Sequence, residues 1–237
     1  MSFPRGYELL DLHNHTDRSY DAANRLDDYE RAHAEGRFNV LALTDHNRID
    51  GAVDAAARAT FPVIVGMEID TAEGELIGLF LQEPISPGLP AAETAERIRA
   101  QSGLVYLQHP FYRLIRHPLA DATREALADA GLIDVVEGRN GGPFTGRADE
   151  RARAWGRARG LPLGAGSDAH EPLDIGQCVV AVPPGLLSSA SLLERLREGA
   201  IVDRHRNSVV QLATKARYRS AGGIAAALRG APRRRLP

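Results

Sequence analysis

The residues best suited to chemistry in this sequence are histidines and carboxylates that directly follow short apolar segments. His13 and His15 are two residues apart in DLHNHT, so on an extended chain both face the same side and could bind one metal ion. The segment LPLGAGSDAHEP repeats this spacing with Asp168 and His170, and its small residues would allow a close approach of the backbone. Imidazole and carboxylate groups in such an arrangement are typical of divalent-metal sites.

Three further apolar segments end in the same kinds of side chain. LALTDHN ends in Asp45 and His46, where the aspartate could orient the neighbouring ring, bind a metal directly, or cap the helix that follows. Glu68 ends the apolar segment VIVGMEID, where a carboxylate is costly unless a cation or hydrogen-bond donors receive it. His109 leaves VYLQHPF directly before a proline, and a hydrogen-bonded core histidine is the alternative interpretation.

The elements that must position these side chains are short strands that alternate with longer amphipathic stretches. This alternation predicts one α/β domain with a mostly parallel sheet. The predicted strands span 7–12, 40–44, 63–68, 75–81, 105–108, 135–137, 163–165 and 177–182, and the predicted helices 26–35, 50–59, 91–102, 119–130, 147–159 and 191–198. Because the C-terminal ends of parallel strands share one face, we expect the polar side chains to converge there.

The ordered set H-x-H, TDH, G-x-E, HP and SDAH, spread from Leu10 to His170, resembles the PHP family, named for polymerase and histidinol phosphatase. The resemblance implies a distorted (β/α)7 barrel with a trinuclear metal centre at the C-terminal ends of the strands. By motif, it implies that a first ion is held by His13, His15, Glu68 and Asp168. Glu68 would bridge to a second ion, also held by His109, and the third ion would take Asp21, His46 and His170.

Two positions in this implied ligand set have alternative interpretations. Asp21 follows His15 by six residues, where similar proteins place an aspartate or a histidine, but it could also be a turn residue ahead of the next helix. Many members of the family have a histidine where GELIGLF places Glu75. Either Glu75 replaces that histidine at the second ion, or the second ion is weakly bound.

The implied centre would suit the hydrolysis of phosphate esters, with two or three Mn, Fe or Zn ions that grip phosphate oxygens and activate a water molecule. We expect a small phosphorylated metabolite or nucleotide as substrate. Asp45 would orient His46 or a metal-bound water, and both residues are predicted to be catalytic together with Arg139. Arg139, and also Arg113 in another loop, would bind the substrate phosphate unless they are simply solvated, and Arg116 is a further candidate.

The overall formal net charge of −2 hides a basic C-terminal segment. Residues 204–237 contain nine Arg or Lys residues and no Asp or Glu. We therefore expect a barrel domain over residues 1–203 and a basic extension over 204–237 that is helical and then frayed. A basic segment could bind nucleic acid, so a nuclease or cyclic phosphodiesterase is an alternative function. A non-catalytic PHP-like binding scaffold is a third.

Composition also limits the setting in which the protein works. The single cysteine, Cys178, cannot form an intramolecular disulfide. No apolar run is long enough to span a membrane, and the N-terminal residues do not resemble a signal segment. We therefore expect a cytoplasmic protein that does not bind membranes.

Overall fold

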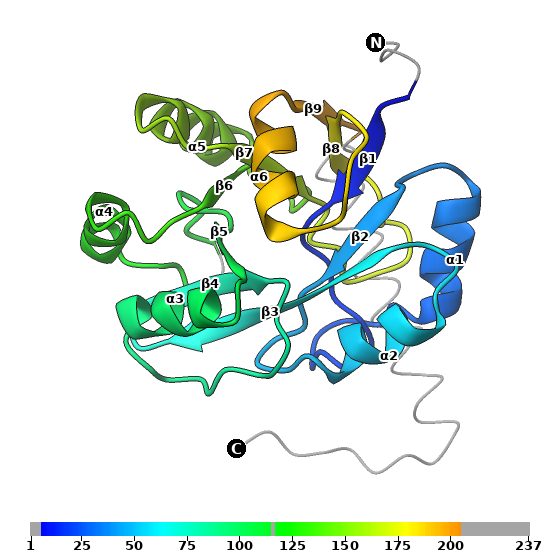
Figure 1. The fold of residues 1–237 in the computed structure, drawn as a ribbon, viewed down its shortest axis with the longest axis horizontal. Helices are drawn as coiled ribbons and strands as arrows, with labels where there is room; N and C mark the ends of the chain where they lie inside the picture. Colours follow the sequence, from blue (N-terminus) through cyan, green and yellow to red (C-terminus); the bar gives the residue numbers. More distant parts are fainter. Residues whose placement is uncertain (1–5, 115–116, 205–237) are drawn as a thin grey trace.

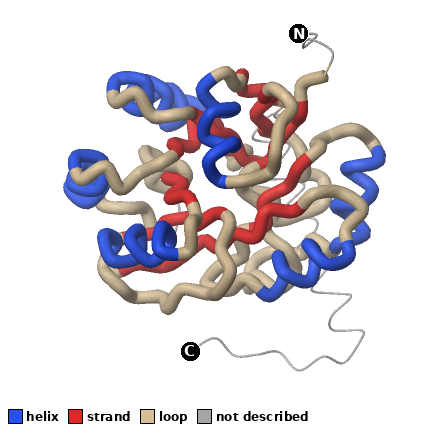
Figure 2. The backbone as a smooth tube through the Cα atoms, viewed as in Figure 1, coloured by secondary structure: helices blue, strands red, loops and turns tan. Residues whose placement is uncertain are grey.

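The computed structural model describes residues 6–114 and 117–204, and in this part of the chain helices surround a ring of strands (Figures 1 and 2). The strands are β1 (Glu8–Asp11), β2 (Val40–Leu43), β3 (Val63–Thr71), β4 (Gly74–Leu79), β5 (Leu104–Leu107), β6 (Val135–Asn140), β7 (Leu163–Gly166), β8 (Cys178–Val182) and β9 (Ala200–Asp203). The helices are α1 (Leu26–Ala34), α2 (Asp50–Arg58), α3 (Ala91–Ala100), α4 (Asp121–Asp129), α5 (Gly146–Ala158) and α6 (Ser189–Arg197). Among these described residues, no helix has both the length and the apolar character needed to cross a bilayer.

The sheet is parallel over β1–β3 and over β5–β7, as the sequence predicts, and two strands, β4 and β8, run in the opposite direction. Its order is β7-β6-β5-β4-β3-β2-β1-β8-β9, and β4 runs antiparallel to both β3 and β5. Only two residues separate β3 from β4, which is too short for the crossover that a parallel pair needs. As a result β4 begins at the edge of the sheet where its parallel neighbours end, and this places Glu75 at that edge.

Strands β1 to β7 form a nearly closed barrel, which agrees with the predicted distorted (β/α)7 barrel. The two end strands meet beyond their regular pairing, where the Leu12 amide donates to the Ala165 carbonyl at 3.1 Å. The Asp168 amide likewise donates to the His13 carbonyl at 2.7 Å. β8 pairs antiparallel with the first part of β1, and β9 extends the sheet from β8.

Alternating strand side chains divide the core into an interior layer and an outer layer. In β2, Val40 and Ala42 face the interior cluster, whereas Leu41 and Leu43 pack in an outer cluster with residues of α1 and α2. A second outer cluster joins β3, β5 and β6 to α3, α4 and α5. Helix α6 differs because its buried leucines, 192 and 196, belong to the interior cluster, and Figure 1 shows α6 lying across the middle of the ring.

Helix α6 lies at one end of the described barrel, where its leucines pack into the interior and its Arg195 pairs with Glu8. β8 runs opposite to β1, so the loop that leads from β8 into α6 starts beside the N-terminal end of β1. The interior is therefore sealed by apolar packing at the N-terminal ends of the parallel strands. The polar residues collect at their C-terminal ends.

Candidate metal centre

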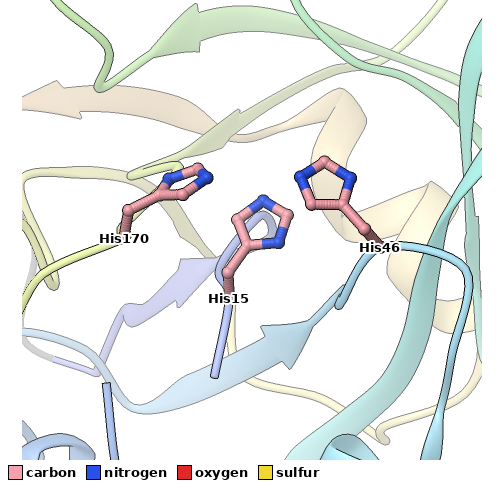
Figure 3. Close-up of side chains that lie close together, drawn as sticks. All are labelled: His15, His46 and His170. Atoms are coloured by element: carbon pink, nitrogen blue, oxygen red, sulfur yellow. The ribbon is translucent and has the colours of Figure 1, made fainter. Parts of the chain in front are cut away.

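The histidines and carboxylates predicted from the strand ends meet at the C-terminal end of the barrel. Their ligand atoms fall within 4.8 Å of one another in three overlapping groups: His13, Glu68 and His109; His13, His15 and Asp168; and His15, His46 and His170. Figure 3 shows the last group, whose rings come from loops after β1, β2 and β7. Since the groups share His13 and His15, they form one continuous cluster that could hold more than one ion.

His13 lies at the centre of this cluster and is fully buried. Its Nδ1 is 3.1 Å from Oε1 of Glu137, and its Nε2 is 3.3 Å from Oε2 of Glu68 and 3.2 Å from Nε2 of His15. Burial lowers the pKa of His13, but the negative charges of Asp168, Glu68 and Glu137 outweigh burial and raise this pKa well above its ordinary value. The surroundings of Nε2 therefore attract positive charge, as a metal site must.

His15 is oriented by a serine that the sequence did not point to. The Ser19 hydroxyl donates to Oδ1 of Asp45 at 3.0 Å, accepts the His46 amide at 3.1 Å and lies 3.3 Å from Nδ1 of His15. A hydroxyl has a single proton to donate, and Asp45 takes it, so Nδ1 of His15 must carry the hydrogen of its contact with Ser19. The Nε2 lone pair of His15 is then directed to the cluster.

Asp45 is placed differently from the expectation that it orients the His46 ring or a water molecule. Its oxygens accept hydrogen bonds from the Thr16 amide at 2.6 Å and the Thr16 hydroxyl at 2.7 Å, in addition to Ser19. Asp45 is fully buried. Through the Ser19 hydroxyl, Asp45 is connected to the ring of His15. The same hydroxyl contacts His46 only at its backbone amide.

Asp21 joins the cluster between two of the histidines, where the resemblance places it. Its Oδ2 is 3.3 Å from Nε2 of His170 and 3.6 Å from Nε2 of His46. Burial raises the pKa of Asp21, but the contacts with His170 and His46 outweigh burial and hold this pKa well below the ordinary value. Its Oδ1 is buried and receives no hydrogen bond from the described residues. A buried carboxylate oxygen in that position suits a cation.

Glu68 and His109 lie together on another side of the cluster. His109 places Nε2 3.3 Å from Oε1 of Glu68, and Gln108 donates to the same oxygen at 3.1 Å. Glu75 is buried at the start of β4 but falls outside the three groups. Burial and the charge of Glu68 raise the pKa of Glu75 to about 9. Burial and the nearby negative charge thus favour the neutral carboxyl of Glu75 unless a cation lies beside it, and its role as a ligand stays a prediction.

Two of the ligand-bearing residues also have unusual backbone conformations. His109 has φ of 28° and Asp168 has φ of 49°, in the left-handed region that residues other than glycine rarely adopt. Such strain persists where the surrounding structure enforces it, and it is common at functional sites.

The structure does not bring the predicted phosphate-binding arginines to this cluster. Arg139 donates to Asp149 at 2.6 Å and to Asp203 at 2.8 Å, so its guanidinium is neutralised between α5 and β9. The cause is a β-bulge between Glu137 and Arg139, which leaves Glu137 facing the interior and turns Arg139 outward. Arg113 pairs with Asp121 and donates to the Leu119 carbonyl. Arg116 lies outside the described residues.

The sequence reasoning missed Glu137, although the same kind of signal was present. Like Glu68, it is one carboxylate at the end of an apolar strand, here VVEG. Glu137 is fully buried and accepts hydrogen bonds from the Tyr106 hydroxyl at 3.2 Å and from the His109 amide at 2.8 Å, besides its contact with His13. It therefore acts as a support for two candidate ligands. Ser19 had no comparable signal, because serine at a loop position is ordinary.

Sequence comparison matches two family models in succession along this one barrel. The model described as "PHP domain" matches residues 11–143, and the model described as "PHP-associated" matches residues 146–201. Uncharacterized protein MJ1587 of Methanocaldococcus jannaschii is 41% identical over 101 residues, which are 41% of this chain and 56% of that protein. The chain thus spans about half the length of this curated relative.

Solved structures with similar folds are more distant in sequence. A two-domain protein from Bacteroides vulgatus, which contains a predicted PHP-like metal-dependent phosphoesterase, has a TM-score of 0.65 at 18% identity, covering 86% of this chain and 68% of that one. The lesion-specific endonuclease PfuEndoQ from Pyrococcus furiosus has a TM-score of 0.61 at 16% identity, covering 82% and 57% of the two chains. These likenesses establish the fold. Since the PHP domain model covers more than half of the sequence, the chain belongs to the PHP family.

Proposed function

We propose that this protein is a metal-dependent phosphoesterase that hydrolyses a small phosphorylated metabolite or nucleotide with a metal-activated water. The observation that carries the proposal is the convergence of three overlapping ligand groups at the open end of a PHP-family barrel. The predicted phosphoesterase domain named for the Bacteroides vulgatus protein supports it.

The residues present fit two or three divalent ions of Mn, Fe or Zn. Three carboxylates and five imidazoles gather without a thiolate, a donor set that suits these metals. The orphaned Oδ1 of Asp21 and the field around Nε2 of His13 are the structural signs of missing positive charge. When bound, the ions would supply positive charge for phosphate oxygens and lower the pKa of water.

We assign the ligands of the three positions as the family resemblance implies. The first position takes His13, His15, Glu68 and Asp168; the second takes Glu68, His109 and, as a replacement for histidine, Glu75; and the third takes Asp21, His46 and His170. Within this set, Glu137 and Ser19 hold the rings of His13 and His15 with Nδ1 protonated, and the Asp168 carbonyl does the same for His170 at 2.9 Å. Nε2 is then the nitrogen of each ring that is left to bind an ion, in exchange for any proton it carries.

The proposal is tested by adding Mn, Zn or Fe to the purified protein and assaying a panel of phosphomonoesters and nucleotides. We expect hydrolysis of at least one ester and its abolition in His13→Ala. His33→Ala is the matched control, because His33 lies on α1 and contacts the Phe38 carbonyl at 3.0 Å. A protein that binds no metal under any of these conditions would contradict the proposal.

The basic segment supports a second candidate, a nuclease or cyclic phosphodiesterase. Beyond Arg204, the segment 204–237 lies outside the described residues. Two predictions therefore remain part of the proposal: that the segment is helical and then frayed, and that it is separate from a barrel domain over 1–203. PfuEndoQ is named as an endonuclease, which makes nucleic acid a reasonable substrate to assay. Oligonucleotide affinity should fall when the chain is cut after Ser220 and Arg217 and Arg219 are neutralised. Unchanged affinity would exclude this role for the segment.

A further inference from the structure

The two carboxylate oxygens of Asp168 face different neighbours. Oδ1 faces the candidate metal centre, where it lies 3.3 Å from Nε2 of His15 and 3.6 Å from Nε2 of His13. Oδ2 accepts a hydrogen bond from the side-chain amide of Asn140 at 3.3 Å. Because a carboxylate can bind an ion through one oxygen or through both, the contact that holds Oδ2 determines which of these modes Asp168 can use.

The backbone of Asp168 is held in place, so the positions of its two oxygens depend on its side-chain torsions. The Asp168 amide donates to the His13 carbonyl at 2.7 Å, and the Asp168 carbonyl lies 2.9 Å from Nδ1 of His170. Its φ of 49° persists because the surrounding structure enforces it. The hydrogen bond from Asn140 therefore restrains the part of Asp168 that the backbone leaves free to turn.

The side-chain amide of Asn140 has one favourable orientation. Asn140 is buried, its Oδ1 accepts the Gly142 amide at 2.7 Å, and its Nδ2 donates to Oε2 of Glu137 at 2.9 Å as well as to Asp168. Turning the amide over would set its oxygen against two carboxylates and its NH₂ group against the N–H of Gly142. Asn140 therefore directs both N–H groups of its side chain at acidic residues.

The backbone of Asn140 is anchored at the end of β6. Its amide donates to Oδ1 of Asp149 at 3.3 Å. Its carbonyl accepts from the guanidinium of Arg139 at 2.6 Å and from the Thr145 hydroxyl at 3.0 Å. These contacts tie Asn140 to the first turns of α5, so Asn140 can hold the side chain of Asp168 in place rather than follow its movements.

We infer that Asn140 is a positioning residue that holds Asp168 as a one-oxygen ligand and thereby keeps a coordination position of the first ion open for a phosphate oxygen. The inference rests on the proposed function and on the assignment of Asp168 to the first metal position. For both oxygens to bind that ion, the carboxylate would have to turn toward His13 and His15 and give up its bond to Asn140. Its second oxygen would then take the place that an open metal site offers to water or substrate.

The test compares wild type with Asn140→Ala, both as full-length protein saturated with Mn. Calorimetry measures the binding of inorganic phosphate, and the relaxation of solvent protons reports the water on the bound Mn. Asn140→Ala should weaken phosphate binding about 10-fold or more, because phosphate loses a contact with the ion, and should reduce the relaxation at unchanged metal content. Asn39→Ala is the matched control, since the Asn39 side chain accepts the Leu9 amide at 2.8 Å just before β2, at the opposite end of the barrel.

Further variants test whether Asn140 acts through Asp168. In an Asp168→Ala background, Asn140→Ala should change phosphate affinity by less than about twofold, because the oxygen that Asn140 restrains is absent. Equal weakening in both backgrounds would contradict the inference. If Asn140→Ala does not fold, Asn140→Ser makes the same test: it keeps a polar group in the buried position, but its side chain is too short to bridge Gly142 and Asp168, so phosphate binding should again weaken.

Two further results would overturn the inference. One is wild-type phosphate affinity in folded, Mn-saturated Asn140→Ala. The other is a loss of bound metal at saturating Mn, which would make Asn140 a support for Glu137 and for the fold. Neither measurement requires hydrolysis, so the two proposals can fail separately. Phosphate binding that depends on Asn140, in a protein that hydrolyses no ester, would support the open position and contradict the proposed function.

Discussion

At the residue scale, the candidate centre is organised by contacts behind its histidines. Nδ1 of His13, His15 and His170 faces Glu137, Ser19 and the Asp168 carbonyl respectively, which leaves each Nε2 directed to the cluster. The folded protein therefore gives each Nδ1 a partner before any ion binds. Preformed ligands lower the entropic cost of metal binding.

Glu137→Gln should weaken metal binding by about 10- to 100-fold. The carboxylate of Glu137 only accepts hydrogen bonds, whereas the side-chain amide of Gln would direct two N–H hydrogens at groups that are themselves donors. In the folded protein Glu137 faces Nδ1 of His13, the Tyr106 hydroxyl, the His109 amide and the Asn140 side-chain amide. Competition with a chelator of known affinity measures the change. Glu150→Gln, at an exposed position of α5, is the matched control. Equal affinities for wild type and Glu137→Gln would show that Glu137 serves packing alone.

Residue types and spacing predicted most of the candidate ligands because the C-terminal ends of parallel strands must share one face. His13, Glu68 and His109 are far apart in sequence but meet for this reason. Arg139 was misplaced because the prediction ended its strand at residue 137 and put Arg139 just beyond it, whereas β6 continues to Asn140 with a bulge that turns Arg139 outward. Gly138 lies between the two residues that flank the bulge, and a glycine inside a strand often marks one, but the prediction did not use this signal.

At the scale of elements, the barrel closes where β1 and β7 approach more closely than side chains usually allow. A Cβ atom on Gly166 would lie 2.2 Å from Cβ of His13 and 2.7 Å from Oε1 of Glu137. The small residues of LPLGAGSDAHEP therefore permit the close approach that the sequence suggested. Closure of the barrel and placement of His13 depend on the same glycine.

Gly166→Ala should lower the free energy of unfolding by about 1–3 kcal/mol and also reduce bound metal, because the methyl group displaces His13. Thermal denaturation and metal analysis of the same preparations measure the two effects. Gly146→Ala is the control, since a Cβ there meets nothing within 4 Å at the start of α5. Wild-type metal content in Gly166→Ala would mean that the strands can separate without moving the ligands.

The contact between α4 and α5 should stabilise the fold to a degree that depends on pH, because it includes the carboxylate of Glu125. Its carboxylate accepts from Arg124 at 2.8 Å and from Nε1 of Trp155 at 3.1 Å, and it pairs with Arg159. Burial raises the pKa of Glu125, but these contacts outweigh burial and hold the pKa below its ordinary value of 4.5. The stabilisation is therefore present above that pH and is lost as pH falls through the pKa of the folded state.

Glu125→Gln should lower the free energy of unfolding by about 0.5–1 kcal/mol at neutral pH, because solvent screens a side chain that is 39% exposed. The difference from wild type should shrink when urea unfolding is repeated below pH 4.5. Glu150→Gln again provides the control for the change of charge. A difference that stays constant across this pH range would assign the effect to packing against Trp155.

At the scale of the whole molecule, the two matched family segments belong to one working unit. The PHP domain match ends at residue 143, whereas Asp168 and His170 lie in the PHP-associated match at 146–201. The second segment also supplies β7, which closes the barrel against β1, and α6, which fills the interior. Neither segment contains the complete ligand set.

The apolar seal made by α6 has a consequence for kinetics. With Leu192 and Leu196 packed into the interior at one end, we expect exchange with solvent to run through the other end of the described barrel, where the candidate ligands lie. Ions, substrate and product must then share that route, so an anion bound there should delay the escape of metal. Inorganic phosphate should slow the stripping of metal by a chelator in stopped-flow measurements, and chloride at equal ionic strength should not. Equal rates in the two salts would imply a second exit. By this prediction, the protein would lose its metal ions most slowly while an anionic substrate or product is bound.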